Sequence, residues 1–106
     1  MGTHCALGVK MEDGNIMGCY VHYDGYEEHM IPAIKDYLRW NTTTGLAVLI
    51  ARAQTTGGIR FFSGDSPEFL EDATPYVITS SNWNEDHFGT HAWYLVDYET
   101  GNIDAI

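Results

Sequence analysis

The chain has 106 residues, of which 44% are hydrophobic and 13% are aromatic. This length and composition are typical of one folded domain with its own hydrophobic core, so we expect a single domain over 1–106 and not a disordered tail. Fifteen acidic residues against five Lys and Arg give a formal net charge of −10, which disfavours binding to nucleic acid or to an anionic membrane. The same charge favours basic partners, although many small proteins use it for solubility alone.

The N-terminal residues and the apolar segments predict a cytoplasmic protein. Met1 to His4 lacks the basic and then apolar order of a signal peptide. The longest apolar run, Leu46 to Ala51, is far shorter than the roughly 18 residues that a membrane-spanning helix needs. We therefore expect the reducing cytosol, where Cys5 and Cys19 remain thiols.

A β-hairpin is predicted at the N-terminus. Asp13-Gly14 is a strong signal for a two-residue turn, and it joins two strand-like segments, 4–11 and 16–23. With this loop, Cys5 faces His22 across the hairpin. Both faces of the hairpin are largely apolar, so we expect a helix on one face and a loop or a second copy of the chain on the other.

This register also decides what the cysteines can do. Side chains alternate along a strand, so Cys5 and Cys19 project from opposite faces and cannot form a disulfide. A thiol opposite an imidazole, as with Cys5 and His22, is the raw material of a catalytic nucleophile. The sequence shows neither a third orienting group nor an oxyanion hole, so an inert core thiol is the plainer interpretation.

The middle of the chain predicts helices. Asp24 followed by Glu27 fits a capping box at the start of a helix, and Pro32 implies that this helix either kinks or begins there. A second helix is predicted at 45–54, and Gly57-Gly58 ends it.

The rest of the chain predicts short elements. Ser66-Pro67-Glu68 is typical of the first turn of a short helix, which we expect to end near Asp72. The other elements are strands at 59–62 and 76–79, a polar loop at 80–89, and a hairpin of 92–98 and 102–106. This order predicts an α+β fold, in which an antiparallel sheet built from N-terminal and C-terminal hairpins carries two or three helices on one face.

Histidines beside carboxylates are the first candidates for chemistry. His22 and Asp24 could form a general base or a metal site, but a structural role for both is the plainer interpretation. His87 and His91 have the spacing of metal ligands on a helix, yet Gly89 between them disfavours a helix. We therefore expect exposed loop histidines, no catalytic residue, no metal and no cofactor.

Acidic residues gather in three parts of the sequence. Glu68, Glu71 and Asp72 share the predicted short helix, Glu85-Asp86 lie in the polar loop, and Asp97, Glu99 and Asp104 lie in the C-terminal hairpin. If they converge on one face, they imitate the spacing of duplex phosphates, and Trp83 beside them serves as an aromatic anchor. A dispersed, solvated surface is the plainer alternative.

The segment Cys19–Glu27 reads Cys-Tyr-Val-His-Tyr-Asp-Gly-Tyr-Glu. It resembles an aromatic-x-His-aromatic-Asp-Gly-Tyr motif of small phage-encoded proteins of unknown function. The matching residues are Tyr20, His22, Tyr23, Asp24, Gly25 and Tyr26. Glu27 departs from the motif, because the phage proteins tend to have Pro there. The resemblance implies an accessory protein that binds and disables a host component, such as a CRISPR effector, a restriction enzyme or RNA polymerase.

Charge and resemblance together predict a non-enzymatic inhibitor in the bacterial cytoplasm. Its partner would be a host protein with a basic, nucleic-acid-binding surface, which the acidic residues engage by nucleic-acid mimicry. An alternative is a protein that sequesters a nucleotide-like signal in a pocket near His22, Tyr23 and Arg60. A His/Asp or metal-dependent hydrolase is a third hypothesis. A homodimer stays open, because the first hairpin has a second apolar face.

Overall fold

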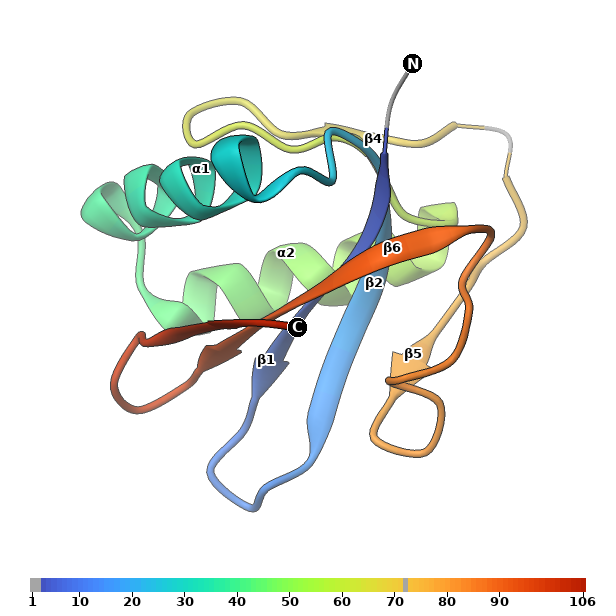
Figure 1. Ribbon diagram of the computed structural model, residues 1–106. Coiled ribbons are helices and arrows are strands. Elements are labelled where there is room, and N and C mark those ends of the chain that lie inside the picture. Colours follow the sequence, from blue (N-terminus) through green and yellow to red (C-terminus); the bar gives the residue numbers. More distant parts are fainter. Residues whose placement is uncertain (1–2, 72) are drawn as a thin grey trace.

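The computed structural model describes residues 3–71 and 73–106 (Figure 1). In chain order its elements are β1 (His4–Lys10), β2 (Ile16–Tyr23), α1 (Glu27–Trp40), α2 (Thr43–Thr56), β3 (Ile59–Phe61), β4 (Glu68–Phe69), β5 (Ile78–Thr79), β6 (Thr90–Asp97) and β7 (Ile103–Ala105). The strands form one sheet in the order β4-β3-β2-β1-β6-β7, and β5 pairs with β2. The α+β class is confirmed, with two helices in the described part of the chain. None of the helices described is long and apolar enough to cross a bilayer.

The sequence predicted a purely antiparallel sheet, but the observed sheet is mixed. β1 pairs antiparallel with β2, and β6 with β7, which confirms both hairpins. However, β6 runs parallel to β1, and β3 runs parallel to β2. Between β2 and β3 the chain passes through both helices, and such a crossover returns it to the same end of the sheet. Turn signals do not encode this long-range direction.

The register of the first hairpin differs from the prediction by one residue. The loop spans 11–15 instead of Asp13-Gly14 alone, and a backbone hydrogen bond of 2.8 Å joins its first and last residues. Cys5 therefore pairs with Val21 and not with His22. A slip of one residue moves every side chain of a strand relative to its partners on the other strand.

The two cysteines consequently lie on the same face of the hairpin, and the prediction of opposite faces is wrong. Cys5 and Cys19 are fully buried free thiols in the main core. Burial raises the pKa of both thiols well above the usual range, and for Cys5 the neighbouring Cys19 and Asp24 add to this effect. Both side chains thus stay protonated and unreactive at neutral pH.

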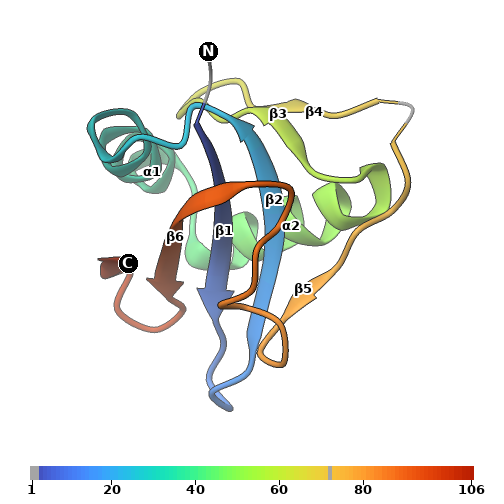
Figure 2. The same ribbon diagram turned by 45° about the vertical axis from the view of Figure 1, so that its right-hand side comes forward.

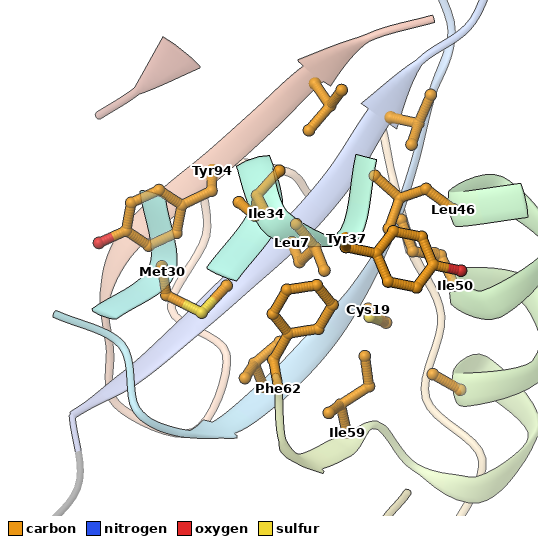
Figure 3. Close-up of a cluster of buried hydrophobic side chains, with 14 of the residues drawn as sticks. Leu7, Cys19, Met30, Ile34, Tyr37, Leu46, Ile50, Ile59, Phe62 and Tyr94 are labelled. Carbon is orange, nitrogen blue, oxygen red and sulfur yellow. The ribbon is translucent and has the colours of Figure 1, made fainter. Parts of the chain in front are cut away.

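Both helices pack on one face of the sheet, as predicted. Figure 3 shows Met30 and Ile34 of α1 and Ile50 of α2 in the same core as Leu7 of β1. All four side chains are fully buried. Removing such apolar area from water contributes about 25 cal/mol per Å², which makes this core the main source of stability.

The start of α1 differs from the predicted capping box. The helix begins after Tyr26, which occupies the N-cap position without a side-chain hydrogen bond. Asp24 lies outside the helix, and its buried Oδ1 has no hydrogen-bond partner within the described chain. Pro32 lies inside α1, so the helix does not begin there. α2 extends beyond the predicted range of 45–54 at both ends and stops at the predicted breaker, because Gly57 adopts a left-handed φ of 98°.

The predicted helix at Ser66-Pro67-Glu68 is replaced by an edge strand. β4 pairs antiparallel with β3, so the open edge of the sheet supplies hydrogen bonds that a single helical turn cannot match. Asp72, where that helix was expected to end, lies outside the described residues.

A loop covers the second face of the first hairpin, which agrees with one of the two predicted covers. Figure 2 shows α2 behind the sheet and the loop before β6 in front of it. Trp83 from this loop packs with Ala6 and Ile78 in a small second core. It lies against Gly8 and Gly18, where a Cβ atom would be 2.7 Å and 3.0 Å from its ring.

Candidate functional site

Two residues of the predicted motif begin the candidate site. Tyr20 and His22 are two residues apart on β2, so their side chains share one face of the sheet, the face opposite the helices. The Tyr20 hydroxyl and His22 Nδ1 are hydrogen-bonded at 2.8 Å. The His4 ring stacks on the His22 ring with centroids 4.6 Å apart, and His4 Nδ1–H donates to the His22 carbonyl at 2.6 Å. These contacts fix the orientation of both β2 side chains.

Tyr20 and His22 are both uncharged at neutral pH. Burial, and secondarily the neighbouring His4, lower the pKa of His22 below its ordinary value of 6.5. Burial, with a smaller contribution from Cys5, raises the pKa of Tyr20 to about 12. Tyr20 and His22 therefore present a neutral, hydrogen-bonded aromatic pair.

Two further aromatic side chains complete a pocket of about 450 Å³. The Phe88 ring lies 5.3 Å from the Tyr20 ring and 4.8 Å from the Tyr76 ring. Tyr20, His22, Tyr76 and Phe88 all line this pocket, together with Leu70 and smaller residues of the same segments. We call it the aromatic pocket.

Phe88 holds an unusual backbone conformation. Its φ is 60°, a left-handed value that costs a bulky residue about 1–3 kcal/mol. Asp86 fixes the turn around it, since its carboxylate accepts from Gly89 N–H at 2.7 Å and from Thr90 N–H at 3.2 Å. The ring is nevertheless 64% exposed, so core packing does not explain its position. Strain at an exposed aromatic residue points to a role in binding.

His87, next to Phe88, is a correction to the sequence interpretation. It is only 1% exposed, not an exposed loop residue, and its Nδ1 is hydrogen-bonded to the Tyr76 hydroxyl at 2.7 Å. His91 lies on β6 and is exposed. Among the residues described, no group of three or more His, Cys, Asp or Glu side chains is placed to hold a metal ion.

Acidic residues stand next in the chain to residues that line the aromatic pocket. Glu71 follows the lining residue Leu70, and Glu85 and Asp86 precede Phe88; all three acids are exposed. Burial raises the pKa of Tyr76, and the charges of Glu85 and Asp86 raise it further, which shows that they act on the pocket.

Glu68 belongs to a different environment. Its carboxylate forms an exposed ion pair with Arg60 at 3.1 Å, so part of its charge is compensated. Arg60 is thereby held outside the aromatic pocket, which its side chain does not line. Arg52 lies over the Phe69 ring, 4.8 Å from the centroid. Within the described chain, no Lys or Arg side chain lines the pocket.

The other motif residues do not line the aromatic pocket, although the Tyr23 ring lies 4.7 Å from the ring of the lining residue His22. Tyr23 and Tyr26 are 39% and 53% exposed, near the turn into α1, and Asp24 is half-buried there. Trp83 is 4% exposed in the second core, so the expectation of a surface anchor is wrong. The exposed aromatic residue of that loop, which could act as an anchor, is Phe88. In the sequence, the neighbouring Gly89 was the only local signal of its special position.

Comparison of the chain with protein-family models, with curated proteins and with solved structures found no match to any of them. The candidate site therefore rests on the geometry described above.

The lowered pKa of His22 predicts a pH dependence of stability. Between the pKa of folded His22 and 6.5, the unfolded chain binds a proton that the folded chain does not. The contribution of His22 to the free energy of unfolding is therefore constant above this window and falls as the pH drops through it. An NMR titration should place the His22 midpoint below 6.5, and His4→Ala should raise it. A wild-type midpoint at or above that value would contradict the stacked, desolvated geometry.

Proposed function

We propose that this protein is a non-enzymatic binding protein that captures and inhibits a basic host macromolecule, in the manner of phage accessory proteins. The expected partner is a nucleic-acid-binding protein of the defence or transcription machinery. The observation that carries the proposal is an open aromatic pocket whose lining residues Leu70 and Phe88 are followed or preceded in the chain by exposed acids, Glu71 after Leu70 and Glu85 and Asp86 before Phe88.

Two physical effects support this function. A net charge of −10 draws a basic partner toward the protein and repels nucleic acid and anionic membranes. Aromatic side chains in a pocket supply the apolar contact that long-range charge lacks, and such residues dominate the energy of many interfaces. Mimicry of duplex phosphates from one helix receives less support, because Glu68 lies on a strand and pairs with Arg60.

The test compares charge removal at two places of equal chemistry. Glu71→Gln with Glu85→Gln neutralises one exposed acid in each of the two segments next to the pocket, and neither side chain makes a hydrogen bond within the described part of the chain. Glu12→Gln with Glu99→Gln makes the same charge change in the loops at the other end of the strands, beyond β1 and β6. Each protein is immobilised and exposed to bacterial lysate at low and at high salt, and the captured proteins are identified.

The expected result is a basic protein that the wild type and the control variant capture at low salt. High salt and the Glu71→Gln/Glu85→Gln variant should each reduce that capture about tenfold or more. Salt screens the attraction between exposed charges, and the loss of a close charge pair weakens binding by up to a few kcal/mol. Purified target should then lose nucleic-acid binding when the wild type is added. Equal capture by both variants would contradict the proposal.

The pocket also favours a second candidate, the capture of a small planar ligand. Its volume of about 450 Å³ lies in the range of small-molecule sites, and half of its lining residues carry aromatic rings. A nucleotide would bring phosphates to a pocket with acidic flanks, so an uncharged base or nucleoside fits better. Native mass spectrometry of the freshly purified protein should detect such a ligand at one equivalent, and loss of that mass in Phe88→Ala would place it in the pocket.

A further inference from the structure

We infer that the aromatic pocket receives one arginine side chain of the partner, with the guanidinium held against the rings of Tyr20, Tyr76 and Phe88. This inference rests on the proposed function and names the chemistry of its central contact. It assigns a role to Phe88, whose left-handed backbone conformation holds a ring that is 64% exposed.

The rings of the pocket are suited to a flat cation. Tyr20 and Phe88 meet edge to face, with planes inclined by 73°, and the Tyr76 ring is inclined by 56° to that of Phe88. A pocket walled by aromatic rings at such angles offers both ring faces and hydroxyl acceptors. A guanidinium that stacks on one face and donates to a hydroxyl or carboxylate uses both, whereas an ammonium has no plane to stack.

Charge decides between a cation and an anion as the occupant. Glu85 and Asp86 are exposed acids that precede the lining residue Phe88, their charges act on the lining residue Tyr76, and no lining side chain of the described chain is a Lys or Arg. The nearby arginines are engaged elsewhere, Arg60 with Glu68 and Arg52 on the Phe69 ring. A phosphate would thus be repelled, whereas a guanidinium would be attracted by the negative charge of Glu85 and Asp86.

The protein already contains one contact of the proposed kind. Arg52 lies over the Phe69 ring at 4.8 Å, which is within the distance of an attractive cation–π contact. Phe69 immediately precedes Leu70, which lines the pocket. An arginine from the partner would extend this pattern to the rings that no internal cation covers.

The experiment uses three blocked peptides that differ in one side chain: Gly-Arg-Gly, Gly-Lys-Gly and Gly-citrulline-Gly. Citrulline keeps the shape of arginine without its charge. Each peptide is titrated into the isotope-labelled full chain and followed by NMR. The same titration is repeated with Phe88→Ala and with Trp40→Ala, a matched change at an aromatic residue that is 78% exposed on α1. Both residues are exposed, so both variants should fold.

We expect the arginine peptide to shift the resonances of Tyr20, Tyr76 and Phe88. The citrulline peptide should bind about tenfold more weakly, and the lysine peptide should lie between the two. Phe88→Ala should weaken arginine binding by a similar factor, and Trp40→Ala should not change it. Equal binding of arginine and citrulline, or unchanged binding in Phe88→Ala, would overturn the inference.

The lysate capture described above separates this inference from the proposed function. If charge removal at Glu71 and Glu85 abolishes capture but Phe88→Ala does not, the proposed function stands and the arginine contact is wrong. If the wild type captures no salt-sensitive partner but the arginine peptide fills the pocket, the proposed function fails and the site chemistry stands.

Discussion

Trp83→Ala is expected to lower the free energy of unfolding by about 3–5 kcal/mol, the range observed for removal of a large buried aromatic side chain. The Trp83 indole is 4% exposed and lies on the bare backbone of Gly8 and Gly18, with Ala6 and Ile78 beside it. Glycines have no side chains that could move into the space, so the cavity would stay open. Urea unfolding followed by circular dichroism measures the change.

The consequence of this substitution reaches the aromatic pocket. Trp83 anchors the loop that carries Phe88, and that loop makes one wall of the pocket. Arginine-peptide binding should therefore weaken in Trp83→Ala even under conditions where the sheet stays folded. Trp40→Ala deletes the same kind of side chain at a position that is 78% exposed, and it should change stability by less than about 0.5 kcal/mol. A similar small change in Trp83→Ala would show that the loop does not depend on this contact.

Local chemistry predicted the elements that depend on neighbours in the chain. The two hairpins and the end of α2 at Gly57 follow from turn residues and from a left-handed glycine. The register of the first hairpin was missed, because Asp13-Gly14 is only part of the loop at 11–15. The positions at which the two strands end decide which side chains face each other. Cys5 therefore pairs with Val21 in place of His22.

The candidate site could be predicted only in part for a related reason. Tyr20 and His22 were found through a motif within one strand. Tyr76 and Phe88 lie far along the chain, and they reach β2 only because β5 pairs with β2 and β6 with β1. Nothing in a polar loop signals that its phenylalanine is exposed while its tryptophan is buried. That difference arises from the two glycines against which Trp83 packs, and these belong to other strands.

Gly58→Ala is expected to lower the free energy of unfolding by about 2–6 kcal/mol, because two separate costs act at this position. Gly58 has a φ of 137°, which an alanine adopts only with strain. A Cβ atom there would also lie 2.5 Å from the Tyr20 carbonyl oxygen and 3.1 Å from Tyr20 Cδ2. The clash falls on the strand that carries the pocket, so the Tyr20 and His22 resonances should shift in the variant that remains folded.

Gly101→Ala separates the two costs. Gly101 has a φ of 76°, but apart from its two chain neighbours no described residue has an atom within 4 Å of the position that a Cβ would take. This variant should therefore lose only the strain of a left-handed alanine, about 1–2 kcal/mol, and leave Tyr20 and His22 unchanged. Urea unfolding of both variants gives the comparison. Equal losses in the free energy of unfolding would mean that β2 yields to the added methyl group and that the close approach of Gly58 does not hold Tyr20 in place. A larger loss in Gly58→Ala, with resonance shifts confined to the pocket, would show that the glycine pair after α2 sets the position of the Tyr20 ring.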